Sequence, residues 1–245
     1  MRVRFSVSVS WLFVLVFITA GQAALAQARL DVFVTPIPNA PFSGTINVAR
    51  SVVNKDGSIA YFKTSRDIYR DSRGRIHNEN RNLLPAGSAE TPQVMSILLY
   101  DPQTRISTTL FPQSHIFTTG TVNRPPETTP PAFIQASPTG NALPQNDFTK
   151  EEDLGIQQME GLPVHGIRET QTIPAPNGSG KNIFVVDEYW YSADLRINMV
   201  IKHNDPRTGG VIMTVTHVSR SEPDPSFLEI PEGYAPAKPA REIQH

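Results

Sequence analysis

The sequence predicts an all-β protein, a strongly curved antiparallel sheet or half-barrel with a Pro-rich loop between its halves. Three observations support this fold class. About ten segments have the length and the apolar or alternating composition of strands. Turn sequences such as Asn54-Lys55-Asp56-Gly57 separate them. No segment has the apolar period of a long amphipathic helix. Many short strands joined by turns favour antiparallel pairing.

The first strands follow from residue alternation. From Thr45, the residues Ile46 and Val48 fall on one face of a strand, and Arg50 interrupts that apolar face. The turn at 54–57 then predicts a hairpin with a second strand over 59–70. Before them, a short strand is expected over 30–35, followed by a proline-containing extended segment.

The middle of the chain predicts three more strands, over 75–82, 94–100 and 105–111. The run Val94 to Tyr100 is almost continuously apolar, as in a strand buried on both faces. Asp101-Pro102-Gln103-Thr104 predicts a type I turn, because proline presets φ at the second position and aspartate bonds back to the backbone.

The second half resumes the β pattern after a proline-rich stretch. Asn177-Gly178 is a strong hairpin turn signal, and the residues from Leu195 to Lys202 alternate as in a half-buried strand. One helical turn is expected around Ser226 to Leu228. The predicted strands of this half cover 153–159, 164–173, 183–191, 195–202 and 211–220.

These elements define the expected domain organisation. Residues 1–26 form a signal peptide, with Arg2 and Arg4 before an apolar run and the small-residue site Ala24-Leu25-Ala26 at its end. Cleavage is expected after Ala26, which makes the protein periplasmic or secreted and not membrane-spanning once cleaved. Residues 27–44 form an extended leader, 45–235 a single β domain with a Pro-rich loop at 124–145, and 236–245 a disordered tail.

Composition excludes several classes of protein. The chain has no cysteine, so neither a disulfide framework nor lipidation after the signal peptide is possible. Its 22 basic and 23 acidic side chains leave a net charge of −1, with no basic stripe for nucleic acid. The six histidines form no metal-binding motif, and neither a metal nor a cofactor is expected.

No catalytic motif is present either. The chain has no Gly-x-Ser-x-Gly elbow and no cysteine nucleophile. One enzyme alternative stays open, a hydrolase that uses Glu169 with Asp187 or Glu188 as a pair of carboxylates. Asp187 and Glu188 cannot form the pair together, because adjacent residues of a strand face opposite sides.

Several motifs resemble a known group of proteins. The stretch from Tyr69 to Arg75 reads Y-R-D-S-R-G-R, the stretch 166–170 reads G-I-R-E-T, and Trp190-Tyr191-Ser192 is followed by Asp205-Pro206-Arg207. Together they resemble an uncharacterised exported family common in acidobacteria, over about residues 45–235. The layout is also distantly similar to the periplasmic lipoprotein-carrier (LolA-like) fold, whose curved sheet cups acyl chains. That likeness implies an apolar ligand, but the chain lacks clear lid helices.

The leading hypothesis is an exported, non-catalytic envelope binding module for an apolar or lipid ligand. A structural or interaction protein that engages an envelope partner through the Pro-rich loop or an edge strand is the alternative. Val94 and Ile183 are further candidates for the concave face. The predicted ligand-binding residues are apolar or aromatic positions of the expected strands: Ile97, Leu99, Val185, Trp190, Ile197, Met199 and Ile201.

Overall fold

The computed structural model describes residues 31–122, 148–175 and 180–238. The predicted signal peptide at 1–26, the Pro-rich loop at 124–145 and most of the predicted tail at 236–245 lie outside these residues. So does the turn at Asn177-Gly178.

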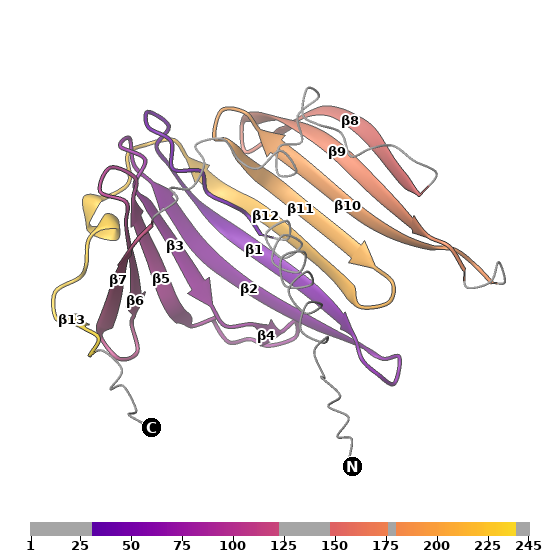
Figure 1. Ribbon diagram of the computed structural model, residues 1–245, viewed down its shortest axis with the longest axis horizontal. Helices are drawn as coiled ribbons and strands as arrows, with labels where there is room; N and C mark the ends of the chain where they lie inside the picture. The colour runs from indigo at the N-terminus through magenta and orange to yellow at the C-terminus, as the bar shows by residue number, and fades with distance from the viewer. Residues whose placement is uncertain (1–30, 123–147, 176–179, 239–245) are drawn as a thin grey trace, which may run out of the picture.

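The described residues form one large, curved, open sheet of thirteen strands (Figure 1). All neighbouring strands are antiparallel except β13, which pairs parallel with β7. The all-β class and the curved antiparallel sheet predicted from the sequence are confirmed. The strands are β1 (Phe42–Val53), β2 (Ile59–Arg70), β3 (Ile76–Arg81), β4 (Leu84–Pro85), β5 (Val94–Asp101), β6 (Ile106–Phe111), β7 (Ile116–Thr121), β8 (Thr149–Met159), β9 (Leu162–Ile173), β10 (Ile183–Ser192), β11 (Ile197–Asp205), β12 (Gly209–Ser219) and β13 (Ala235–Pro236).

The two halves of the chain meet at the centre of the sheet. The strand order is β13-β7-β6-β5-β3-β2-β1-β12-β11-β10-β9-β8, with β4 paired to β2 off this path. The last long strand, β12, therefore pairs with the first, β1. The predicted hairpin of β1 and β2 pairs over its whole length, from Phe42 opposite Arg70 to Val53 opposite Ile59.

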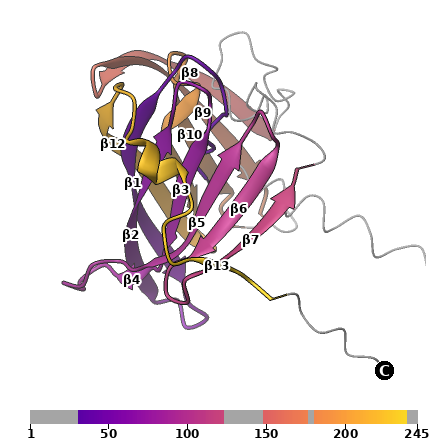
Figure 2. The same ribbon diagram turned by 90° about the vertical axis from the view of Figure 1, so that its left-hand side faces the viewer.

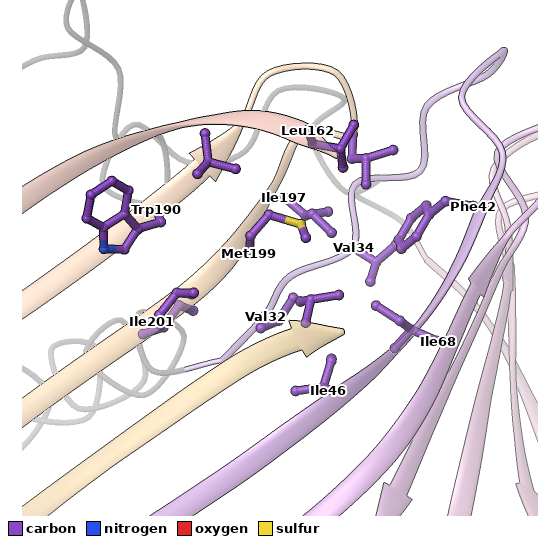
Figure 3. Packing of buried hydrophobic residues seen from close by; sticks show 14 of the residues in the cluster. Val32, Val34, Phe42, Ile46, Ile68, Leu162, Trp190, Ile197, Met199 and Ile201 are labelled. Carbon is purple, nitrogen blue, oxygen red and sulfur yellow. The ribbon is translucent and has the colours of Figure 1, made fainter. Parts of the chain in front are cut away.

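The N-terminal segment, residues 31–41, crosses the concave face of this sheet, which we call the inner face (Figures 1 and 3). Its Val32 and Val34 are buried against apolar side chains of β1, β2 and β11. Directly opposite residues of antiparallel strands share a face. The register therefore places Ile201, Met213 and Val48 together on the inner face.

The C-terminal segment covers the other, outer face over β2, β3 and β5 (Figure 2). A 3-10 helix, Pro225–Leu228, begins after Asp224, whose side chain accepts a hydrogen bond from Ser226 N. The Phe227 ring stacks on Tyr69, with centroids 4.3 Å apart. The ring nitrogen Nδ1 of His77 lies 2.6 Å from the Phe227 carbonyl oxygen. The expected helical turn around Ser226 to Leu228 is confirmed.

Four sequence expectations need correction. The strand Val94–Asp101 is not buried on both faces, because Met95 and Leu98 are 43% and 40% exposed. Residues 31–35 form no strand, since this segment packs on the sheet through side chains and does not join its ladder. The first long strand begins at Phe42, inside the predicted leader of 27–44. A strand at Ile116–Thr121, rich in β-branched threonine, was not predicted.

Candidate functional site

A groove of about 650 Å³ opens on the inner face beside the N-terminal segment. It lies over the halves of β1, β2 and β12 that are remote from the main core, and the start of β5 and the segment after β3 complete it. Its lining residues are Asp31, Val48, Arg50, Ser51, Thr64, Arg66, Asn80, Arg81, Asn82, Leu83, Met95, His203, Thr208, Gly209, Gly210, Val211 and Met213.

The floor of the groove is apolar. Val48 on β1 lies directly opposite Met213 on β12, and Val211 follows two residues away on the same face. Leu83 and Met95, which also line the groove, are each 43% exposed. Large apolar side chains exposed in a concave lining are typical of small-molecule binding sites.

One arginine of the groove, Arg66 on β2, is largely buried, with 13% of its side chain exposed. Its Nη2 forms an ion pair with Asp31 of the N-terminal segment. Its Nε is buried without a hydrogen-bond partner, and so is the Oγ1 of Thr64, two residues earlier on the same face of β2. The lining thus contains a cation and a hydroxyl that the described protein atoms leave incompletely satisfied.

The other cationic side chains of the lining differ in their partners. The Nη2 of Arg81 lies 2.6 Å from Glu79 Oε2 and 3.2 Å from Asp67 Oδ2, so this guanidinium is already held by carboxylates. Arg50 is exposed and has no ion pair within the described residues. It is the residue that interrupts the apolar alternation of β1.

His203 adds a titratable group at the edge of the groove. Its Nδ1 lies 2.7 Å from Oδ1 of Asp187 on the neighbouring strand β10. The hydrogen bond to Asp187 raises the pKa of His203. The proximity of the carboxylate therefore favours the protonated imidazolium.

The residues predicted to bind a ligand do not line this groove. Ile197, Met199 and Ile201 are fully buried in the core, with Val32 of the N-terminal segment packed near them (Figure 3). Val185 is buried on the same face of β10 as Tyr189. Ile97 and Leu99 lie on the other face of β5 from Tyr100, and Leu99 lines a small crevice of about 250 Å³ with Leu228 and Ile230.

Trp190 is buried on the outer face of the sheet. Tyr189 of β10 and Ile201 of β11, which lie opposite each other, are on the inner face. Trp190 lies directly across from Gly166 on β9 and Val200 on β11. Its Nε1 donates a hydrogen bond to Glu188 Oε1 at 2.8 Å, which places both side chains on the same side of the strand. A Cβ added at Gly166 would lie 2.7 to 2.8 Å from three ring atoms of Trp190. The absence of a side chain at Gly166 therefore leaves room for the indole to pack on the sheet.

The variant Gly166→Ala is expected to lower the free energy of unfolding by about 1–3 kcal/mol, the usual cost of overpacking. The added methyl group must displace a rigid indole held by Glu188. Urea denaturation followed by circular dichroism measures the change. Gly120→Ala on β7 is the control, because a Cβ there meets nothing within 4 Å. Equal stability of the two variants would show that the indole moves freely.

The carboxylates of the hydrolase alternative lie outside the groove. Glu169 and Asp187 are directly opposite each other on β9 and β10, and Glu188 is on the other face. Glu188 accepts hydrogen bonds from Lys202 Nζ at 2.7 Å, from Trp190 and from Arg168 Nη2 at 3.0 Å. Burial alone would raise the pKa of Glu188, but these three donors outweigh it and lower the pKa to about 2. Such a carboxylate stays ionised and cannot serve as a general acid.

The Glu188 cluster predicts a pH dependence of stability. The pKa of Glu188 is about 2 in the folded chain, against an ordinary value of 4.5 that applies to the unfolded chain. The ionised Glu188 therefore stabilises the fold fully above about pH 4.5, and this stabilisation is lost as the pH falls through about 2. The stability difference between the wild type and Glu188→Gln should therefore be constant near neutrality and shrink below pH 4.5. Urea titrations at successive pH values measure it, with the exposed Glu90→Gln as control. A difference that grows on acidification would contradict this assignment.

Within the described residues, no group of three or more His, Asp or Glu side chains is placed to hold a metal ion. The same part of the chain contains no helix long and apolar enough to cross a membrane.

Comparison with solved structures finds several bacterial proteins with weak similarity to this chain. An uncharacterised conserved protein from Thermus thermophilus is 9% identical, with a TM-score of 0.39 over 88% of this chain and 98% of that one. A LolA superfamily protein from Nitrosomonas europaea is 9% identical, with a TM-score of 0.28 over 85% and 96%. The Mycobacterium tuberculosis lipoprotein LppX is 12% identical, with a TM-score of 0.26 over 84% and 98%.

At these identities and scores, the solved structures assign no ligand and no site to this chain. No protein-family model matches the sequence. No curated protein matches it either. The likeness to the lipoprotein-carrier fold and the resemblance to the acidobacterial family therefore both stay predictions.

Proposed function

We propose that the protein is an exported, non-catalytic binding module of the cell envelope, and that its inner-face groove takes an apolar or lipid-type ligand. One observation carries this proposal, the groove itself with its floor of Val48, Val211 and Met213. Its volume of about 650 Å³ is in the range of small-molecule sites, roughly 300–1,000 Å³.

The exposed apolar side chains of the groove supply the driving force. Leu83 and Met95 both line the groove, and each residue is 43% exposed. A ligand chain that covers them removes apolar surface from water, which contributes about 25 cal/mol for each Å² buried. The unbranched methionines Met95 and Met213 also adapt to chains of different shape.

The proposed site is therefore displaced from the one that the sequence suggested. The ligand contacts Val48, Met95 and Met213, while Ile197, Met199 and Ile201 support the sheet beneath the N-terminal segment. An apolar sheet face can bind a ligand only where no other segment covers it. The N-terminal segment covers one part of the inner face, and the groove leaves the adjoining part open.

Filling the groove tests the proposal. A fluorescent fatty acid such as cis-parinaric acid is titrated into the wild type and into Met213→Trp. The indole occupies the groove floor, so the affinity of the variant is expected to fall by about tenfold or more, the factor that corresponds to 1.4 kcal/mol. Ile212→Trp is the matched control, because Ile212 is the next residue of β12, faces the other side and is 46% exposed.

If binding were unchanged in Met213→Trp, or equally weakened in Ile212→Trp, the ligand would bind outside the inner-face groove. Absence of binding by the wild type would overturn the function. Native mass spectrometry of the protein from its own host supplies an independent readout, the mass of any apolar compound that copurifies.

A further inference from the structure

We propose that the ligand of the inner-face groove is an anionic amphiphile, whose carboxylate or phosphate group is bound by Arg50 and Arg66. This inference rests on the proposed function and specifies the chemical class of the ligand.

The charges of the lining are unbalanced. Four of its side chains are basic, Arg50, Arg66, Arg81 and His203, and one is acidic, Asp31. Arg81 is satisfied by Glu79 and Asp67, and His203 by Asp187. Asp31 accepts from Arg66 alone among the arginines of the groove. Within the described residues, one carboxylate thus faces the two remaining guanidinium groups.

Arg66 and Thr64 provide the buried part of the anion site. A buried donor without an acceptor destabilises the protein, and more so where the group is charged. Both the Nε of Arg66 and the Oγ1 of Thr64 are in this state, on successive inner-face positions of β2. A ligand oxygen that approached both atoms after a shift of the Arg66 side chain would satisfy them together. A neutral alkyl chain would leave them as they are.

Arg50 provides the exposed part. It lies two residues from Val48 on β1, and Val48 is directly opposite Thr64. Successive same-face positions of a strand are about 7 Å apart. The long side chain of Arg50 can therefore reach an anionic group located above Thr64. A guanidinium binds carboxylate and phosphate oxygens in a bidentate manner, so two arginines that line one groove favour an anion over a neutral hydroxyl.

The apolar floor of the groove favours an amphiphile over a free anion as the ligand. Val48, Val211 and Met213 line the same groove as the arginines. Inorganic phosphate would cover none of this surface. An acyl chain with an anionic end satisfies both the floor and the cations.

Calorimetric titration with a matched ligand pair tests the inference. Laurate and dodecanol share one chain and differ in charge. Each is titrated below its aggregation or solubility limit into the wild type, Arg50→Gln, Arg66→Gln and Lys63→Gln. The wild type is expected to bind laurate more tightly than dodecanol. Arg50→Gln should weaken laurate binding by about tenfold or more, as for loss of a hydrogen bond to a charged group, and leave dodecanol binding unchanged.

Two controls keep this experiment interpretable. Lys63→Gln removes a positive charge from the opposite face of β2 and should change neither affinity. Arg66→Gln also breaks the ion pair with Asp31, so its thermal unfolding is measured alongside. Arg50 is exposed, and its variant should fold as the wild type does.

The outcomes separate the inference from the proposed function. Equal binding of laurate and dodecanol by the wild type, or equal losses in Lys63→Gln and Arg50→Gln, would overturn the anionic assignment and leave an apolar site. If sodium phosphate displaced laurate at similar concentrations, the groove would be a site for a free anion, and the assignment of an amphiphilic ligand would be wrong. Failure of the wild type to bind either compound would overturn the proposed function itself.

Discussion

Replacing Arg70 by methionine is expected to lower the free energy of unfolding by about 3–5 kcal/mol, because three backbone carbonyl groups lose their donor and each buried group left unsatisfied costs about 1–3 kcal/mol. The Arg70 side chain is completely buried near the end of β2. Its Nε donates to the Ala40 carbonyl at 2.8 Å, and its Nη1 donates to the carbonyls of Thr35 at 2.8 Å and Leu195 at 3.0 Å. One guanidinium therefore joins the N-terminal segment to the turn between β10 and β11.

The size of this effect follows from what methionine leaves behind. Burial lowers the pKa of Arg70 to about 10, which still keeps the group charged at neutral pH. Methionine fills a similar volume but donates nothing, so three carbonyl groups lose a charge-assisted donor. Urea denaturation followed by circular dichroism measures the loss.

Arg73→Met is the matched control for this prediction. Arg73 is three residues away, and its side chain is 56% exposed beside Asp71. Exposed ion pairs contribute about 0–1 kcal/mol. If Arg70→Met were no less stable than Arg73→Met, the carbonyl network would not hold the N-terminal segment.

Phe42→Ala is expected to destabilise the protein by a similar amount, about 3–5 kcal/mol, as for other buried aromatic truncations. Phe42 is the first residue of β1 and is 0% exposed. It packs in the core near Val34 and Ile68 (Figure 3). The guanidinium carbon of Arg70 lies 4.7 Å from the centroid of the Phe42 ring. Alanine would leave a cavity where the N-terminal segment enters the sheet.

Phe184→Ala on β10 is the control, because Phe184 is 51% exposed and should contribute much less. Thermal and urea unfolding of both variants check the prediction. The double variant Phe42→Ala/Arg70→Met should lose less stability than the sum of the single losses, because the two residues are in contact. Strict additivity would show that the cation and the ring do not interact.

Most of the sheet could be predicted from local patterns. The second strand was expected over 59–70 and is observed at Ile59–Arg70, because a turn signal bounds it on one side and alternation fills it. The strand Ile116–Thr121 is not predicted from the sequence, because its threonines and Gly120 give no apolar alternation. It is recruited by pairing with β6, a tertiary effect that local patterns do not contain.

The site was harder to predict, for a physical reason. Periodicity shows which residues share a face, but not which segment covers that face. Ile201 and Met199 are in the core because the N-terminal segment packs over them, and Leu99 borders the C-terminal segment. Arg50 was the one local signal of the groove, since a cation within an apolar strand face indicates that the face is open at that point.

Photo-crosslinking shows most directly whether the ligand binds on the inner face. A diazirine-bearing fatty acid is bound to the protein, the sample is irradiated, and the modified residues are mapped by mass spectrometry. Labels are expected on Val48, Met95 and Met213, and they should be lost when unlabelled laurate is present. Labels confined to the crevice of Leu99, Leu228 and Ile230, or spread over the outer face, would contradict it.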